Sequence, residues 1–332
     1  MFLSLTFDFF LLLLTFRKKS RGLKVFGKPK FQGGPFTKFN QLQFISVSRF
    51  KSYSSLICLS SVYVPILFLK ILKLIGVRLL VNQNGVYYPS WYSKNYKKKN
   101  VYLKKLNAFS HHTFFQSEFA LRSYKDWVGP PPANYSILYN PVDMKIFYPA
   151  TNKPPTPLKI IFFYDFQKRN SDLWKYCFNF IEFAEKKMAY PHEWIMMGRT
   201  TDHAVLTAYP ALSNIQFILN PGNQVPEILR TCHVAVHLVY NDVCPNKVLE
   251  CMASGIWVIT HSAGGSAELV GSAGTVIPVP FNYEKAFYPS YEELFSALDK
   301  YIKNPLEYEQ KTIQHSKSFH LNNWYNKLSD KF

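Results

Sequence analysis

Two acidic residues and a pair of glycines stand close together in the second half of the chain. Asp242 follows an apolar run, Glu250 lies inside the helical pattern that comes next, and Gly264-Gly265 follows the next apolar run. A carboxylate can accept two hydrogen bonds from neighbouring hydroxyl groups of a sugar. Glycine backbone that opens a helix can approach a phosphate closely. The combination indicates a sugar-nucleotide site, in which one acid holds the ribose and the other holds the donor sugar.

Each of these signals has a plain structural alternative. A glutamate in a helix commonly faces solvent, and a glycine pair commonly marks only a turn. Glu250, however, stands between Leu249 and the apolar residues 251–253. A bare carboxylate in such a setting is costly unless it is bonded. The binding interpretation and the structural one therefore both stay open on these residues alone.

The elements that must position these residues form a series of strands and helices after residue 157. Strands are predicted at 158–166, 192–198, 214–219, 234–240, 257–261 and 274–279, and helices at 171–188, 225–232 and 245–254. Alternating strands and helices are typical of a parallel sheet. Ligands bind outside the carboxyl ends of such strands, where Asp242 and Gly264-Gly265 are expected.

The first half of the chain has a similar pattern. Strands are predicted at 23–27, 55–61, 77–83 and 112–117, helices at 63–76 and 118–129, and a turn at 129–136. Gly33-Gly34 follows the first strand and opens a predicted helix. We therefore expect two Rossmann-like domains in tandem. Their predicted bounds are 22–145 and 158–305, with a Pro-rich linker at 146–157 and a C-terminal helical segment at 306–332.

Charge separates the two halves of the 332-residue chain, whose formal net charge is +18. Residues 1–150 hold 22 basic and 4 acidic side chains, whereas residues 151–332 hold 17 of each. Such asymmetry suggests that the first half faces an anionic partner, either nucleic acid or a membrane. The basic clusters at 17–30 and 94–105 match no recognition-helix or zinc-finger pattern, so we favour an anionic membrane or a phosphate-bearing acceptor over nucleic acid.

Residues 1–16 are almost wholly apolar and are followed at once by the basic collar 17–21. A spanning helix needs about 20 apolar residues, and this run is shorter and contains Asp8. A secretory signal would carry its basic residues first. The segment is therefore either a shallow membrane anchor or a segment without a membrane role. Five cysteines without a C-x-x-C pattern favour a reducing, cytoplasmic compartment, with peripheral membrane association left open.

The segment 241–271 resembles the hallmark of the family 4 retaining glycosyltransferases of the GT-B fold, in which an acid precedes a glutamate by seven intervening residues. The matching positions are Asp242, Glu250, Met252, Ala253, Gly255, Gly264, Gly265, Glu268, Leu269 and Val270. Two upstream stretches resemble the same family through Ser117, Asn140, Val142, Asp143, Phe147 and Pro149. The resemblance extends over residues 112–280.

This resemblance implies an α/β GT-B architecture, in which two parallel-sheet domains face a central cleft and the N-terminal domain is shortened. It implies transfer of a hexosyl or related sugar, with retention of configuration, from a nucleotide-sugar donor to a hydroxyl of a glycan or lipid-linked acceptor. Neither a cofactor nor a catalytic metal is implied. Asp242 and Glu250 are the implied catalytic residues. The implied donor-binding residues are Lys168, Arg169, Asp242, Asn246, Glu250, Gly264, Gly265 and Glu268, and the N-domain cleft residues are Gly33, Gly34 and Asn84.

The chain departs from the family pattern at several positions. The first acid is Asp242 where the family usually has Glu, and Trp257 replaces a usual Pro. No Gly-Arg follows the strand at 158–166, which leaves Lys168 and Arg169 as candidates. Asn84 stands where an N-domain His is expected, with His111 and His112 as nearby alternatives. These departures motivate an alternative function, a catalytically impaired sugar-nucleotide-binding or partner-binding protein of the same fold.

Overall fold

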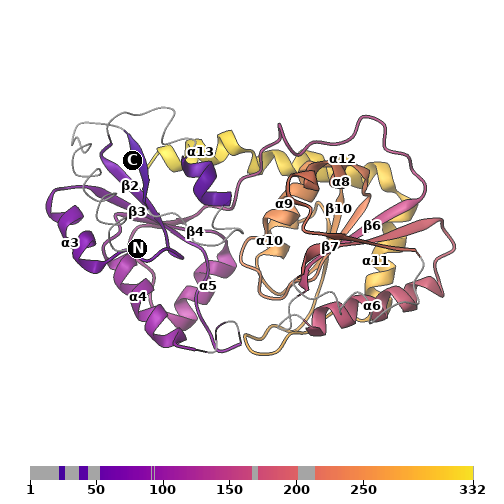
Figure 1. Cartoon of the computed structure of the whole chain (residues 1–332), viewed down its shortest axis with the longest axis horizontal. Helices are drawn as coiled ribbons and strands as arrows, with labels where there is room; N and C mark the ends of the chain where they lie inside the picture. Colours follow the sequence, from indigo (N-terminus) through magenta and orange to yellow (C-terminus); the bar gives the residue numbers. More distant parts are fainter. Residues whose placement is uncertain are drawn as a thin grey trace. The chain divides into compact units, whose positions relative to one another are not determined.

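The computed structural model of the chain describes residues 22–26, 37–43, 53–90, 92, 94–166, 171–200 and 214–331. The chain divides into two compact units (Figure 1). The N-terminal unit comprises residues 1–140 together with 322–332, and the C-terminal unit comprises residues 141–321. The domain bounds derived from the sequence stay predictions, and the predicted segment 1–21 lies outside the described residues.

The described part of the N-terminal unit is built on a parallel five-stranded sheet of order β1-β2-β3-β4-β5. Its strands are β1 (Leu23–Phe26), β2 (Ser55–Leu59), β3 (Arg78–Gln83), β4 (His112–Phe115) and β5 (Tyr135–Ile137). Its helices are α3 (Ile66–Leu74), α4 (Tyr96–Ala108), α5 (Glu118–Trp127) and α13 (Leu321–Ser329), with a further helical stretch at 37–43.

Helices α3 and α4 bury their apolar stripes against the same face of this sheet. Leu69 and Leu72 of α3 and Leu106 of α4 join one core with Val81 of β3. Parallel pairing places Phe115 of β4 on the face of Val81, and its ring packs edge-on against Tyr124 of α5, with centroids 5.3 Å apart. Three successive helices therefore cover this face. This is expected when each new strand is added at the same edge of the sheet, because right-handed crossovers then pass over the same face.

The C-terminal unit has a parallel six-stranded sheet of order β11-β10-β9-β6-β7-β8 among the described residues. Its strands are β6 (Leu158–Phe166), β7 (His192–Thr200), β8 (Ile215–Leu219), β9 (Val234–His237), β10 (Trp257–His261) and β11 (Thr275–Ile277). Its helices are α6 (Ser171–Glu185), α8 (Val225–Thr231), α9 (Asn246–Ala253), α10 (Ser266–Val270), α11 (Tyr291–Lys303) and α12 (Pro305–Ser316), with short 3-10 turns at Gly222–Gln224 and Lys317–Phe319.

The strand order reverses direction at one place in this sheet. The chain runs outward from β6 to β8, returns to the other side of β6 at β9, and then runs outward again to β11. Loops that leave neighbouring strands at such a reversal diverge and leave room for a ligand at the carboxyl edge. The loop after β9, which carries Asp242, therefore leaves the sheet beside the loop after β6.

The fold class expected from the sequence is confirmed as two parallel α/β units. Several elements differ from expectation: α11 matches no predicted helix, β9 is shorter than the strand predicted at 234–240, and two more differences lie in the N-terminal unit. The basic run at 94–105 forms most of α4, because Asn100, Leu103 and Leu106 recur on one helical face and are buried while the lysines point outward. The end of the predicted turn at 129–136 enters β5, a three-residue edge strand.

One helix start provides a stability test that is independent of any ligand. The Ser290 hydroxyl accepts a hydrogen bond from the Glu293 backbone, and the Glu293 carboxylate accepts one from the Ser290 backbone N–H. Replacing a capping serine removes a partner from an otherwise unsatisfied backbone donor. We expect Ser290→Ala to lower the free energy of unfolding by about 1 kcal/mol in urea denaturation. Ser318→Ala, which removes an exposed hydroxyl that donates to the His315 carbonyl and caps no helix N-terminus, should cost less.

Candidate functional site

The loop after β9 and the turn after β10 are in direct backbone contact. The Gly265 backbone N–H donates to the Asp242 carbonyl at 2.7 Å. Gly264 has a φ of +106°, and a Cβ atom there would lie 2.8 Å from the Asp242 carbonyl oxygen. Only a residue without a side chain permits this approach. The close packing fixes where the Asp242 carboxylate projects from the loop.

Burial acts strongly on the Asp242 carboxyl group. It raises the pKa of Asp242 to about 6, although backbone hydrogen bonds from Cys244 and Val243 partly oppose the shift. The side chain nevertheless keeps 32% of its surface exposed. A carboxylate that is poorly solvated but still reachable is suited to accept hydrogen bonds from a ligand.

His237, the last residue of β9, lies behind Asp242. Its Nε2 is 3.8 Å from Asp242 Oδ2, and its Nδ1 is 3.3 Å from the Ser266 hydroxyl of α10. Burial, reinforced by neighbouring His261, lowers the pKa of His237 to about 3, so the imidazole is neutral. A neutral ring supplies a polar backing for the carboxylate without pairing with its charge.

His261 occupies the equivalent position at the end of β10. Its Nε2 lies 3.2 Å from the Leu238 carbonyl, and its Nδ1 accepts from the Ala263 backbone N–H at 3.2 Å. These partners favour the neutral tautomer that is protonated on Nε2. Sequence reasoning missed both histidines. The available signal was their shared position as the final residue of adjacent buried strands.

Glu250 lies in the second turn of α9, as predicted, and its carboxylate has a cationic partner. Lys247 Nζ donates to Glu250 Oε2 at 2.7 Å, and the glutamate side chain is 14% exposed. The pair explains how a carboxylate is held beside Cys251 and other buried side chains of the helix. One carboxylate oxygen thus has a partner of its own before any ligand arrives.

The other predicted donor-side residues divide into two groups. Asn246 begins α9, and Glu268 lies in the first turn of α10, a short helix that packs against α9. Asn246 therefore shares α9 with Glu250, whereas Glu268 lies on the helix that follows the Gly264-Gly265 turn. Lys168 and Arg169 of the loop after β6 lie outside the described residues, as do Gly33 and Gly34 of the N-terminal unit.

Asn84 stands at the carboxyl end of β3 in the N-terminal unit. Its side-chain oxygen accepts from the Ser60 hydroxyl at 2.8 Å, and its backbone N–H donates to the same hydroxyl at 3.1 Å. His111 and His112, the alternatives to Asn84, lie at the amino end of β4 instead. They contact the Leu79 backbone and the Ser136 hydroxyl. The two histidines thus lie at the opposite end of the sheet from Asn84.

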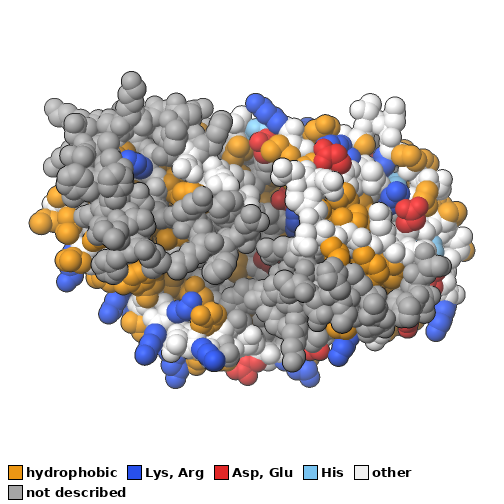
Figure 2. Space-filling view, viewed as in Figure 1, with side chains coloured by type: hydrophobic (Ala, Val, Ile, Leu, Met, Phe, Trp, Pro, Cys, Tyr) orange, Lys and Arg blue, Asp and Glu red, His pale blue; other side chains and the backbone are white. Residues whose placement is uncertain are grey.

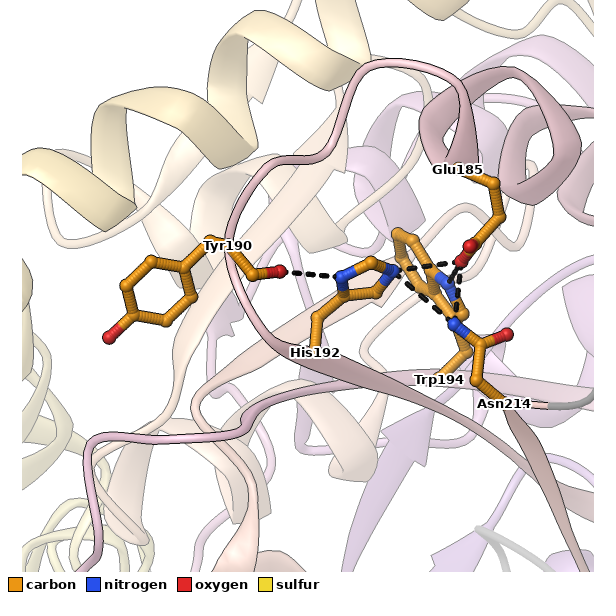
Figure 3. Close-up of polar contacts among 5 residues, drawn as sticks. All are labelled: Glu185, Tyr190, His192, Trp194 and Asn214. Carbon is orange, nitrogen blue, oxygen red and sulfur yellow. Dashed lines mark hydrogen bonds and ion pairs between the residues drawn. The ribbon is translucent and has the colours of Figure 1, made fainter.

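A second polar cluster in the C-terminal unit surrounds one oxygen of Glu185 (Figure 3). Glu185 Oε1 accepts from His192 Nε2 at 2.8 Å, from Trp194 Nε1 at 2.5 Å and from Asn214 Nδ2 at 2.7 Å. Burial opposes ionisation of Glu185, but these hydrogen bonds prevail and lower its pKa. The cluster joins the end of α6 to the amino ends of β7 and β8. It therefore fastens the sheet at the end away from Asp242.

The described residues contain neither a candidate metal site nor a candidate membrane-spanning helix. Among residues 22–26, 37–43, 53–90, 92, 94–166, 171–200 and 214–331, no group of three His, Cys, Asp or Glu side chains is arranged to hold a metal ion. In the same ranges no helix has the length and apolar character to cross a bilayer.

The C-terminal unit is similar to a known protein family. Residues 175–319 match the family model described as glycosyl transferases group 1. By sequence, no curated protein matches the chain significantly.

Solved structures resemble the chain over most of its length. Sucrose-phosphate synthase of Thermosynechococcus elongatus aligns with a TM-score of 0.63 and 12% identity, covering 88% of this chain and 76% of that one. Anabaena HepE in complex with UDP aligns with a TM-score of 0.62 and 13% identity, covering 84% and 78%. The trehalose 6-phosphate synthase of Burkholderia multivorans aligns with a TM-score of 0.61 and 11% identity, covering 91% and 77%. The chain therefore has the GT-B fold of these glycosyltransferases, and its residues 175–319 resemble the glycosyl transferases group 1 family.

Proposed function

We propose that the protein is a retaining glycosyltransferase that moves a hexosyl or related sugar from a nucleotide-sugar donor to a hydroxyl of a glycan or lipid-linked acceptor. The observation that carries this proposal is the locked pair of turns at Asp242 and Gly264-Gly265. It holds a reachable carboxylate over the carboxyl edge of the sheet. Further support comes from Anabaena HepE, of the same fold, which has been solved with UDP, with UDP and glucose, and with UDP-glucose.

We propose different roles for the two acids, in line with the exposure and the partners of each. Asp242 is one-third exposed and accepts hydrogen bonds from the donor-sugar hydroxyls. Glu250, already paired with Lys247, accepts from the ribose hydroxyls with its remaining acceptor capacity. Because the Gly265 N–H is occupied by the Asp242 carbonyl, we assign Gly265 to holding the loop and not to binding phosphate.

The chemistry proposed needs no cofactor or metal supplied by this chain. The bond from the anomeric carbon to the diphosphate oxygen breaks, and the acceptor oxygen forms its bond on the same face. The acceptor proton leaves with the departing diphosphate, whose charge backbone N–H groups and the cations Lys168 and Arg169 stabilise. His237 touches none of these atoms and is proposed as a positioning residue for Asp242.

Turnover by a conservative variant tests the ribose assignment. We expect Glu250→Gln to lower turnover of the preferred donor at least about tenfold, because a neutral amide accepts ribose hydroxyls more weakly than a carboxylate does. The assay offers nucleotide sugars one at a time with an acceptor extract and measures product or slow donor hydrolysis.

The matched control for this test is Glu227→Gln. Glu227 is also paired three residues along a helix, with Arg230 at 2.9 Å, but its side chain is 66% exposed. Full activity of Glu250→Gln would contradict the site assignment. Nucleotide binding by calorimetry without turnover, across a broad donor and acceptor panel, would instead favour the catalytically impaired alternative.

The pKa of Asp242 predicts two effects of acid with opposite signs. As pH falls below about 6, the carboxylate is protonated, and we expect the donor KM to rise about tenfold per pH unit. Because the folded-state pKa exceeds the ordinary value of 3.8, the folded state takes up this proton first, and the same acidification stabilises the fold at this site. Asp242→Asn should remove both dependences, which pH profiles of KM and of unfolding free energy would measure.

A further inference from the structure

The outer surface of α3 and α4 combines exposed apolar side chains with lysines. Leu67 and Leu74 of α3 have 64% and 86% of their surface exposed, and Tyr63 and Val101 beside them are more than half exposed. Spacing of three and four residues places Leu67, Lys70 and Leu74 along one stripe of α3. Leucines this exposed leave apolar surface in water that a partner would bury.

The two helices present one continuous surface. They pack against each other, and the rings of Tyr63 and Tyr102 are 5.0 Å apart across their junction. Lys73 Nζ also reaches 5.8 Å from the Phe109 ring, which follows α4. Hydrophobic and basic side chains are interspersed over this part of the N-terminal unit in Figure 2, at the place where Figure 1 draws α3 and α4.

The charge of this surface has one sign. Its exposed lysines are Lys70, Lys73, Lys97, Lys98, Lys104 and Lys105. No Asp or Glu occurs in the sequence between Asp8 and Glu118. Within the described ranges, none of these lysines forms an ion pair, so their charge is available to an external anion.

We propose that the α3–α4 surface, defined by Leu67, Leu74, Val101 and these six lysines, docks the protein on an anionic lipid bilayer. The lysines meet the lipid headgroups while the leucines enter the boundary of the acyl chains. The exposed leucines favour an anionic bilayer over a nucleic acid as the partner, since a nucleic acid would leave Leu67 and Leu74 in water. This inference does not depend on the proposed sugar transfer and goes beyond it.

Vesicle binding by the full chain tests the proposal. On phosphatidylcholine vesicles that contain phosphatidylglycerol, we expect Lys97→Gln, Lys98→Gln, Lys104→Gln and Lys105→Gln to weaken binding about fivefold for each lysine removed. Leu67→Ser and Leu74→Ser should weaken it about tenfold each. The matched controls lie in the C-terminal unit: Lys186→Gln with Lys187→Gln for charge, and Leu306→Ser, at a leucine 74% exposed, for apolar surface. The controls should bind like the unchanged protein.

A fluorescent label distinguishes insertion from purely electrostatic contact. All five cysteines are buried, so a polarity-sensitive dye on Leu74→Cys reports that position alone. We expect a blue shift of its emission with anionic vesicles and none with RNA. The proposal would be overturned if the lysine variants and the leucine variants bound anionic vesicles as strongly as the unchanged protein. It would also fall if removal of residues 1–21 abolished vesicle binding while the α3–α4 variants left it intact, because the apolar terminus would then be the membrane contact.

Discussion

Gly264→Ala is expected to lower the free energy of unfolding by about 3 kcal/mol and the turnover of donor about 100-fold. The new Cβ would lie 2.8 Å from the Asp242 carbonyl oxygen and 3.1 Å from its nitrogen, and the φ of +106° is strained for any L residue. Backbone must move to relieve the contact, and the Asp242 carboxylate moves with it. Urea denaturation and steady-state turnover measure the two effects separately.

Gly222→Ala is the matched control for this variant. Gly222 also has a positive φ, of +54°, but a Cβ there meets nothing within 4 Å. It should cost about 1 kcal/mol of stability through backbone strain alone and leave turnover unchanged. If Gly264→Ala behaved in the same way, the close packing of the two turns would not be what positions Asp242.

Glu185→Ala is expected to cost about 3 kcal/mol of unfolding free energy with the donor KM unchanged. It leaves the donors of His192, Trp194 and Asn214 without their shared acceptor, and the Trp194 side chain is fully buried. The network lies at the amino end of the sheet, so its loss should not reach the donor site. Denaturation and donor kinetics on the same preparation check both halves of this expectation.

Acid provides a second measurement on the same residue. The folded-state pKa of Glu185 is lower than its ordinary value of 4.5, so its contribution to stability is full above that pH and is lost as pH falls through the folded-state pKa. Below the folded-state pKa of Glu185, acidification should therefore remove less unfolding free energy from Glu185→Gln than from the unchanged protein. Glu182→Ala, at an exposed position one turn earlier on α6, should match the unchanged protein. An acid profile of Glu185→Gln that follows the unchanged protein would refute the assignment.

Long buried strands and several amphipathic helices were predictable from the sequence, whereas the lysine-rich helix α4 and the short edge strand β5 were not. The strands predicted at 158–166 and 257–261 match the bounds of β6 and β10. Short, mainly apolar runs that are flanked by turn residues are typical of buried strands. Helix α4 was not predicted because its lysines outnumber the apolar residues that it buries, which leaves only a weak helical periodicity of apolar residues. Strand β5 consists of three residues and depends on its neighbour β4, which no local pattern reveals.

The candidate site shows a similar limit. Spacing alone indicated that Asp242 and Gly264-Gly265 belong to one site, since both follow strands of one parallel sheet. The backing histidine His237 was hidden because it sits at the end of a buried run and looks like any core residue. The residues of the Glu185 cluster come from three elements that are separated along the chain. Only the tertiary fold brings them together, so no local sequence pattern predicts the cluster.

The membership of residues 322–332 in the N-terminal unit has a consequence for biosynthesis. Trp324 of α13 is buried, and Lys38 Nζ lies 4.5 Å from its ring. The strand-like contact between Val142 and His320 joins the place where the chain enters the C-terminal unit to the place where it leaves it. On the ribosome, the C-terminal unit is complete at Leu321, before the N-terminal unit has received its last helix. The half of the protein whose synthesis begins first is therefore the half whose residues are completed last.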